Sequence, residues 1–394
     1  MPVVDINRSL IKRLAGLELN NLLYAKILPS DIFQRSRIKS SGTPIYDISG
    51  EILFHRIPIV KNRKIIATTD IAVNSAFRLP LLGVNYGYEW NEKKILKSAI
   101  LAVKKYRKKF QYDKIRFVSY SYPKIAIQFL KDEKEMVMLE LGTWKPVPPQ
   151  RKRRKDESPS NFERWSLTEE ISPSRKKTNL RRFTNQVKRW DKAVPLRKKF
   201  NALSLNAVEF KKAVHLPKFI TYTREVHYGS EKTNNHPCYE LRGQLTNVWC
   251  VAASVQMLLD FYRYNYVQTR IADELGLGTI TNPNGLPYSR DGDVVTVLEN
   301  LTNNALDANM DSNPQWTEFT NEIEHDRPLI SFIPGHSRTV AGYTYSRFTS
   351  FGFIFRGLLV YDPWPPTTGV ITRWENFDAQ TYRVMFTAHL TLEE

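Results

Sequence analysis

The feature that most constrains the fold is a strongly basic stretch in the middle of the chain. The chain has 394 residues and a formal net charge of +18. Between Lys145 and Lys199, eighteen Lys or Arg residues face only six Asp or Glu residues. This stretch opens with "KPVPPQRKRRKDESPS", in which proline, serine and charge leave no apolar face to pack. We therefore predict folded regions over 1–143 and 201–394, joined by a basic linker over 144–200 that is partly disordered or helical.

The N-terminal region alternates helical and strand-like patterns. A helical pattern covers about 11–27, and three β-rich runs separated by turn signals follow within 44–73. A basic helix over about 91–110 then precedes the runs "KIRFVSY", "KIAIQFL" and "EMVMLEL". The order of helix and then meander, used twice, predicts a small α+β domain. Its one histidine, His55, has no cysteine in the region to act on, and we interpret it as structural.

The segment "GQLTNVWCVAASVQMLLDFY" places Cys250 where a polar turn gives way to an apolar, helical run. The helix is therefore expected to begin at the cysteine. A thiol there lies at the positive end of the helix dipole, which stabilises the thiolate and lowers the thiol pKa. Simple packing is the alternative, because free cysteines are among the most buried residue types.

Gln244 lies six residues before Cys250. A thiolate that attacks a carbonyl needs hydrogen-bond donors directed at the developing oxyanion. The Gln244 amide and the backbone N–H of Cys250 could supply two. Without the cysteine, Gln244 would be interpreted as a solvated turn residue.

A base and its orienting partner are both predicted at strand ends. The run "DRPLISFIPGHSRTVAGYTY" reads as a strand, a tight turn and a second strand, which places His336 at the mouth of a hairpin. A neutral imidazole there could take the thiol proton. In the run "RGLLVYDPWPP" an apolar strand is expected to end at Tyr361, and Asp362 follows at the strand end, where its carboxylate could orient the imidazole. Each residue alone fits an ordinary turn, but together the four predict a cysteine peptidase.

From about Cys238 to Trp374 the chain resembles the papain-like cysteine peptidases of the C39-like type. The motifs "GQLTNVWCVAAS", "VQTRIADELGLG", "DRPLISFIPGHSRTVAGYTY" and "LLVYDPWPP" carry the resemblance. It implies an α+β fold for 201–394, with a nucleophile helix and an antiparallel sheet. It also implies Cys250 as nucleophile, His336 as base, Asp362 as orienting residue and Gln244 as oxyanion donor.

The N-terminal region resembles, more loosely, the pro-segments of some papain-like peptidases. The runs "DISGEILFHRIPIV" and "VSYSYPKIAI" carry this similarity. It implies a domain that inhibits the peptidase from within the same chain, with the exposed linker as a natural place to cut. A plain accessory or substrate-binding domain is the alternative.

These patterns also set expectations about partners and location. The expected partner is a peptide or protein substrate. The two cysteines, Cys238 and Cys250, show no paired zinc-site spacing, so neither a metal nor a cofactor is expected. No signal peptide or membrane-spanning run is visible, which favours the cytoplasm. An alternative function is binding of nucleic acid or an anionic surface by the linker, with a non-catalytic peptidase-like domain.

Overall fold

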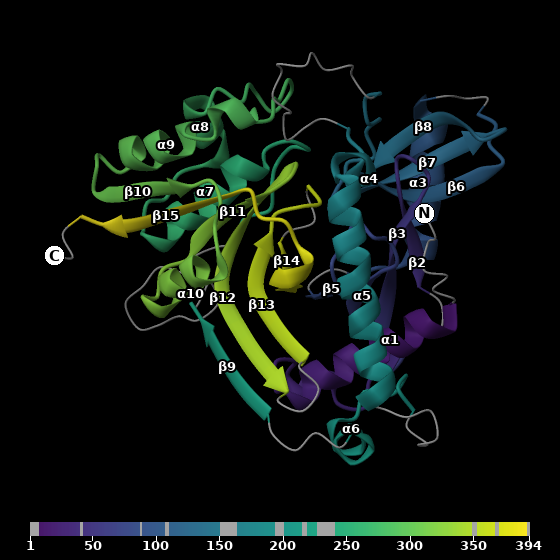
Figure 1. The fold of residues 1–394 in the computed structure, drawn as a ribbon. Helices are drawn as coiled ribbons and strands as arrows, with labels where there is room; N and C mark the ends of the chain where they lie inside the picture. Colours follow the sequence, from purple (N-terminus) through teal and green to yellow (C-terminus); the bar gives the residue numbers. More distant parts are fainter. Residues whose placement is uncertain are drawn as a thin grey trace.

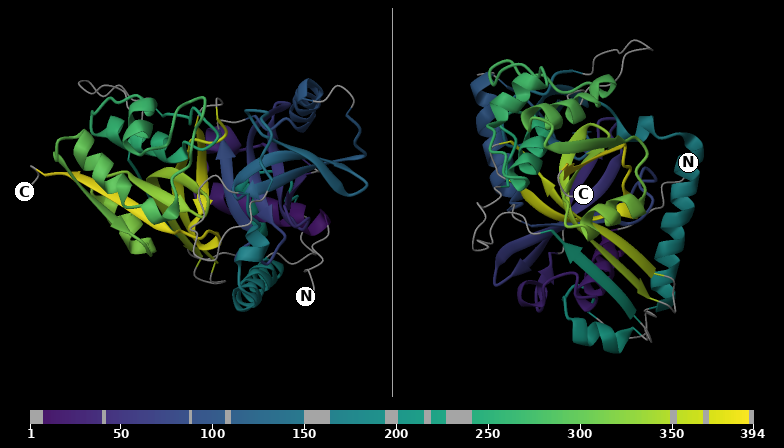
Figure 2. Two further views of the ribbon diagram at one scale, coloured as in Figure 1. Left: turned by 90° about the horizontal axis from the view of Figure 1, so that it is seen from above. Right: turned by 90° about the vertical axis from the view of Figure 1, so that its left-hand side faces the viewer.

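The structure is a computed structural model that describes residues 8–39, 42–86, 89–106, 110–149, 164–193, 201–214, 219–226, 241–348, 353–366 and 370–391. Cys238 and the basic run 151–155 lie outside these residues. The molecule is a mixed α/β structure in which one sheet runs through both halves (Figure 1). Seen from above, the C-terminal half and the N-terminal half lie side by side along the length of the molecule (Figure 2).

The N-terminal half contains the predicted helices and meanders. Its elements are α1 (Arg8–Tyr24), α2 (Ser30–Phe33), β1 (Arg37–Ile38), β2 (Thr43–Asp47), β3 (Ile52–Lys61), β4 (Lys64–Ala72), β5 (Leu81–Tyr86), α3 (Glu92–Tyr106), β6 (Lys114–Ser121), β7 (Lys124–Lys131) and β8 (Lys134–Glu140). The two long helices and six predicted strand runs are confirmed, whereas β5 was missed. The segment that follows contains α4 (Leu167–Glu170), α5 (Pro173–Ala193), α6 (Ala207–Ala213) and β9 (Phe219–Glu225).

The C-terminal half begins with the helix that was predicted to start at the cysteine. Its elements are α7 (Cys250–Phe261), α8 (Gln268–Glu274), η1 (Tyr288–Arg290), α9 (Asp293–Leu301), β10 (Leu306–Asp311), α10 (Trp316–Glu324), β11 (Leu329–Ile333), β12 (His336–Phe348), β13 (Phe353–Asp362), β14 (Ile371–Asn376), η2 (Phe377–Ala379) and β15 (Val384–Leu390). The start of α7, the β11–β12 hairpin and the end of β13 confirm the predicted element boundaries. None of the helices in the described ranges is both long and apolar enough to cross a membrane.

The two halves share one sheet because β5 pairs with β14. The strand order is β10-β15-β11-β12-β13-β14-β5-β4-β3-β2-β6-β7-β8, with β9 on β12 and β1 on β3. Every pair in this order is antiparallel except β2–β6. At the junction, Trp374 is registered with Val84 and Glu375 with Gly83. Backbone pairing therefore continues from one half into the other. The predicted domain boundaries at 143 and 200 remain a proposal.

Buried charges cross this junction. Arg338 on β12 donates two hydrogen bonds, of 2.7 and 3.0 Å, to Glu375 on β14, and both side chains are fully buried. On the N-terminal side, Arg56 donates two of 2.8 Å to Asp70. Arg373 lies between the two pairs, 3.7 Å from Glu375, and the Asp70 charge acts on it. Separating the halves would take the Asp70 charge away from the buried Arg373 guanidinium, which is costly.

Gly83 makes room for this network. A Cβ atom at this position would lie 2.7 Å from the Nε atom of Arg373 and 2.7 Å from the carbonyl oxygen of Trp374. Both distances are below any normal contact, so a side chain would push the buried guanidinium or the strand away. Glycine at this point of β5 is therefore part of what joins the halves.

Helix α5 crosses the same junction (Figure 1). Its Trp190 is fully buried and stacks on Phe353 of β13, with 4.1 Å between the ring centroids. Its Asn179 donates hydrogen bonds to the carbonyls of Ser75 and Ala76, between β4 and β5. This helix belongs to the predicted linker, and it packs against both halves.

Candidate active site

Helix α7 places Cys250 at its first turn. The preceding Trp249 is fully buried and donates a hydrogen bond of 3.0 Å from its indole to the carbonyl of Leu277, which fixes the entry of the chain into the helix. No side chain caps this end of α7, and no acidic residue lies in its first turn. The first backbone N–H groups of the helix are therefore left for another acceptor, and their dipole favours a thiolate at Cys250.

His336 and Asp362 meet at neighbouring strand ends. His336 is the first residue of β12 and Asp362 the last of β13, and the two strands pair. The imidazole Nε2 lies 2.7 Å from Oδ1 of Asp362, which also accepts a hydrogen bond of 3.0 Å from the backbone N–H of Trp364. The other ring nitrogen, Nδ1, makes no hydrogen bond of good geometry within the described residues. The carboxylate therefore fixes the ring through one nitrogen and leaves the other for the cysteine.

The charges in this cluster favour an ion pair. Burial raises the pKa of Cys250, but the hydrogen bond and charge of His336, then the Lys124 ammonium, lower it below its ordinary value. Burial lowers the pKa of His336, but Asp362 and then Cys250 raise it above its ordinary value. Burial raises the pKa of Asp362, but His336 and then Arg338 bring it below its ordinary value. The arrangement can hold a thiolate beside an imidazolium.

Gln244 lies next to the loop that follows Asp362. Its backbone N–H donates a hydrogen bond of 3.0 Å to the carbonyl of Pro363. Its side-chain Nε2 donates one of 2.7 Å to the carbonyl of Thr246, and its Oε1 accepts none within the described residues. The Nε2 group carries a second N–H that this bond does not use. Thus all four residues predicted for the site come from one corner of the C-terminal half.

The tip of the β6–β7 hairpin, residues 120–124, covers this corner from the N-terminal half. We call these residues, which include the end of β6 and the start of β7, the occluding turn. Cys250 and His336 have no exposed surface, and Lys124 is 1% exposed. The pKa of Tyr120 is raised well above its ordinary range by burial, then by Glu140, to which Tyr120 donates a hydrogen bond, and then by the nearby Cys250. A phenol and an ammonium group of the N-terminal half thus lie close enough to Cys250 to interact with it electrostatically.

Gly335 shows how tightly the turn is seated. Its φ of +73° lies in the left-handed region that favours glycine. A Cβ atom there would lie 2.4 Å from the hydroxyl of Ser121 and 2.8 Å from the indole nitrogen of Trp165. Trp165 in turn donates hydrogen bonds of 2.9 Å to the Ser121 hydroxyl and to the carbonyl of Tyr120. The occluding turn and Trp165 therefore form one unit against the residue before His336.

Sequence reasoning missed Tyr120 and Lys124 as residues of this corner. The run "VSYSYPKIAI" that contains them was noticed only as part of a pro-segment-like pattern. A lysine at a hairpin turn is usually solvated, so nothing local shows that this one is buried beside a thiol. Among the described residues, no group of three or more His, Cys, Asp or Glu side chains is arranged to hold a metal ion.

A comparison with known protein families finds a match in the C-terminal half. Residues 234–387 match the Peptidase_C39 like family. This confirms, for that part of the chain, the resemblance predicted from its motifs. No curated protein matches the chain.

Two solved structures also match the chain. One is a double glycine motif protease from an AMS/PCAT transporter in complex with the leader peptide, with 16% identity, 43% of this chain and 99% of that chain covered, and a TM-score of 0.27. The other is UfSP from C. elegans, with 12% identity and a TM-score of 0.24. That match covers 43% of this chain and 34% of the UfSP chain.

Proposed function

We propose that this chain, whose residues 234–387 match the Peptidase_C39 like family, is a cysteine peptidase held inactive by its own N-terminal half. The observation that carries the proposal is the imidazole of His336, fixed by Asp362 and acting on the Cys250 thiol at the start of a helix. A nucleophile, a base and an orienting carboxylate in this relation are the minimum set for covalent acyl transfer.

In the proposed reaction, the Cys250 thiolate attacks the carbonyl carbon of a peptide bond. The negative charge moves to the carbonyl oxygen, where Gln244 Nε2 and the backbone N–H of Cys250 donate hydrogen bonds. The His336 imidazolium then gives its proton to the departing amine as the C–N bond breaks, which leaves a thioester. His336 next takes a proton from water, whose oxygen attacks the thioester, so that an acid is released and the thiol returns.

The proposed restraint is supported by the burial of the site. With Cys250 and His336 fully buried, a peptide cannot reach the sulfur until the occluding turn leaves. A tethered inhibitor acts at an effective concentration in about the millimolar range, so weak docking is enough to keep it in place. The shared sheet and the hydrogen bonds from Arg373 and Asn376 of β14 to the carbonyls of Leu82 and Leu81 of β5 support opening by local movement of residues 120–124 rather than by loss of the whole N-terminal half.

Alkylation of Cys250 tests the ion pair that the proposal needs. Because the pKa of the Cys250 thiol is lowered, the thiolate persists as pH falls, and because the pKa of His336 is raised, the imidazolium persists as pH rises. The thiolate–imidazolium pair therefore exists at pH values between these two pKa values. In a Cys238→Ser chain, we expect the rate of iodoacetamide labelling of Cys250 to stay nearly level from about pH 8 to about pH 6, below the ordinary thiol pKa of about 8.5. Mass spectrometry of the peptide containing Cys250 measures the rate.

His336→Ala is the matched variant for this measurement. It removes the largest of the groups that lower the Cys250 pKa, so the labelling rate should fall about tenfold per pH unit below about pH 8. Identical profiles in the two chains would show that His336 does not act on the thiol, and the peptidase proposal would fail.

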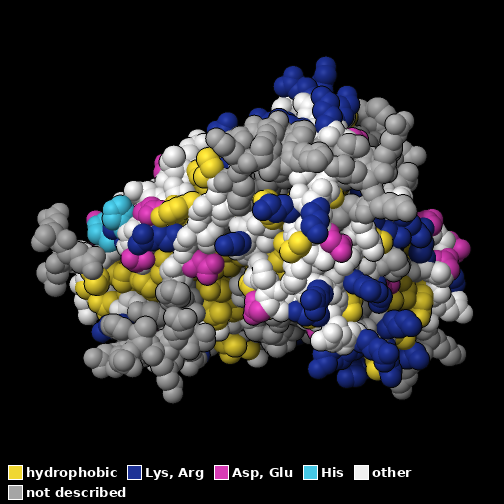
Figure 3. Space-filling model, turned by 90° about the horizontal axis from the view of Figure 1, so that it is seen from below, with side chains coloured by type: hydrophobic (Ala, Val, Ile, Leu, Met, Phe, Trp, Pro, Cys, Tyr) yellow, Lys and Arg dark blue, Asp and Glu magenta, His cyan; other side chains and the backbone are white. Residues whose placement is uncertain are grey.

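Helix α5 supports a second candidate function, binding of nucleic acid or an anionic surface. It exposes six cationic side chains: Lys177, Arg181, Arg182, Lys188, Arg189 and Lys192. Lys and Arg side chains gather on the side of the molecule that contains the N-terminal half and α5 (Figure 3). If this surface binds phosphates, a random oligonucleotide should bind at low salt with an affinity that falls steeply as salt rises. Absence of binding at low salt would remove this candidate.

A further inference from the structure

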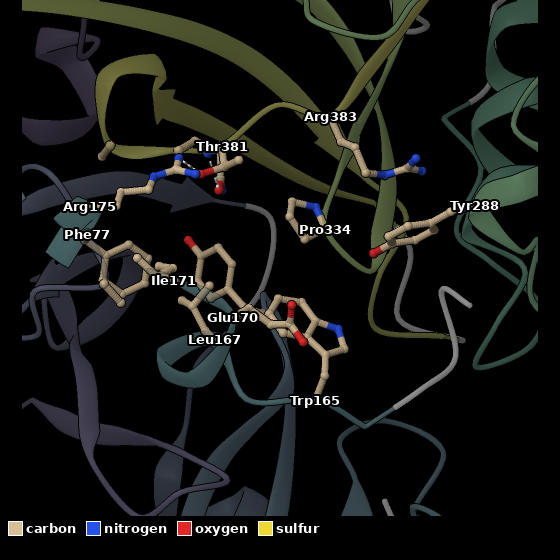
Figure 4. Close-up of a pocket in the computed structure, with 14 residues that line it drawn as sticks. Phe77, Trp165, Leu167, Glu170, Ile171, Arg175, Tyr288, Pro334, Thr381 and Arg383 are labelled. Carbon is tan, nitrogen blue, oxygen red and sulfur yellow. Dashed lines mark hydrogen bonds between the residues drawn. The ribbon is translucent and has the colours of Figure 1, made fainter. Parts of the chain in front are cut away.

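A cavity of about 230 Å³ lies between the two halves, beside the turn that carries His336. Tyr122 lines it from the N-terminal half. Trp165 of the following segment and, from the C-terminal half, Tyr288 and Pro334 line it as well (Figure 4). Tyr122 belongs to the occluding turn, and Pro334 immediately precedes Gly335. Anything bound in this cavity would therefore touch both the occluding turn and the turn before the proposed base.

Much of the cavity wall is apolar. Phe77, Leu167 and Ile171 lie along one side of it, next to Trp165 (Figure 4). The indole N–H of Trp165 is already used by the Ser121 hydroxyl. These side chains offer a ligand ring faces and methyl groups, which suits an aromatic or branched aliphatic body.

One end of the cavity carries positive charge. Arg175 of α5 donates a hydrogen bond of 2.8 Å to the hydroxyl of Thr381, a neutral partner, and it has no carboxylate partner among the described residues. The other cation at the cavity, Arg383, is paired with Asp291 and lies over the ring of Tyr288, 3.7 Å from its centroid. The Glu170 carboxylate also lines the cavity and would repel an anion, so an added anion gains most at Arg175.

Neighbouring arginines add to this positive field. Burial, then the charges of Arg175 and Arg182, lower the pKa of Arg78, and the Asp378 carboxylate only partly offsets them. Asn179 on α5 bonds to the carbonyls of Ser75 and Ala76, so this helix holds its arginines close to Arg78. An anion bound at Arg175 would relieve this repulsion.

We propose that the cavity binds a small carboxylate with an apolar body, such as an arylalkyl carboxylate, and that the bound ligand stabilises the occluded form. The carboxylate would pair with Arg175, and the body would pack against Phe77 and Trp165 and, from the C-terminal half, against Pro334. The second part rests on the proposed restraint by the occluding turn. Because the ligand needs walls from both halves, it binds the occluded form in preference to the open one, and the equilibrium shifts accordingly.

Calorimetry with 3-phenylpropanoate tests the binding site in the full-length Cys250→Ala chain. We expect 3-phenylpropanoate to bind, and both acetate and neutral 3-phenylpropanol to bind at least about tenfold more weakly, because each lacks one of the two required features. Arg175→Ala should weaken binding at least about tenfold, and Thr381→Val less. The control Lys177→Ala, an exposed cation on the same helix, should leave it unchanged. Equal binding of the alcohol, or no effect of Arg175→Ala, would overturn the site.

The labelling rate of Cys250 tests the link to occlusion. In the Cys238→Ser chain, 3-phenylpropanoate at ten times its dissociation constant should slow labelling by about tenfold, and Arg175→Ala should reduce the slowing to about twofold or less at that concentration. An unchanged rate despite measured binding would overturn the stabilising role. The calorimetric signal in the Cys250→Ala chain does not depend on peptidase chemistry. It would survive failure of the proposed function and vanish only if the cavity does not bind the ligand.

Discussion

Replacing Tyr120 and Lys124 together by alanine, in the full-length Cys238→Ser chain, is expected to raise the labelling rate of Cys250 by a peptidyl electrophile about hundredfold. Tyr120 is 3% exposed and Lys124 is 1% exposed, so both lose buried contacts. Truncation of a buried aromatic side chain costs about 3 kcal/mol. That free energy corresponds to about a hundredfold change in the equilibrium between occluded and open forms. The second-order rate constant of labelling measures the change.

Tyr46→Ala is the matched control for this double variant. Tyr46 packs against the small cluster that contains Tyr120, Ala126 and Met138, but it is not among the groups of the described residues that act on the Cys250 thiol. It therefore reports how much labelling rises when that cluster is merely weakened. If Tyr46→Ala accelerates labelling as much as the double variant does, general loosening explains the result. If neither variant accelerates labelling, the occluding turn does not restrain the site.

The elements that carry the proposed catalytic residues could be predicted because their signals are local. The change from a polar turn to small and apolar residues fixes the start of α7 at Cys250. The Pro334–Gly335 pair ends one strand and begins the next, and Pro363 follows the last residue of β13. Such boundaries depend on a few neighbouring residues, so they survive without knowledge of the rest of the fold.

The junction of the halves could not be predicted, because its signals lie far apart in the sequence. Strand β5 and strand β14 are separated by more than half of the chain, and neither shows which partner it has. Arg373 and Glu375 flank Trp374 on β14, and charges at alternate positions of a strand are usually solvated. Here they are buried because Arg338 and Asp70 come to them from other strands.

The position of the occluding turn over the site could not be predicted for the same reason. In the sequence, "SYSYP" before Lys124 reads as an ordinary hairpin turn. Whether that turn faces solvent or another half depends on the pairing of β5 with β14, which sets the position of the whole N-terminal meander. The resemblance to pro-segments suggested inhibition, but the residues that reach the thiol emerge only from the assembled sheet.

Once the occluding turn is weakened, Cys250→Ala is expected to abolish peptide-bond cleavage. In the Tyr120→Ala, Lys124→Ala background, the loss in kcat/KM on a quenched fluorescent peptide library should reach about 10⁴ or more, because the proposed acyl intermediate forms on the Cys250 sulfur. His336→Ala should cause a similar loss, since without the imidazole the thiol is neither deprotonated nor able to pass its proton to the amine. Thermal unfolding of each variant shows whether it remains folded.

Variants of the other two proposed site residues, Gln244 and Asp362, should lose peptidase activity to different extents according to their roles. Gln244→Ala should lower kcat by about a hundredfold with a small change in KM, because it removes one of two proposed oxyanion donors and acts only in the transition state. Asp362→Asn should keep some activity, since the amide can still accept a hydrogen bond from Nε2 of His336 but no longer stabilises its charge. Undiminished cleavage by the Cys250→Ala chain in the opened background would refute the peptidase function. Equal small losses in all four variants would instead indicate that the corner stabilises the fold and performs no chemistry.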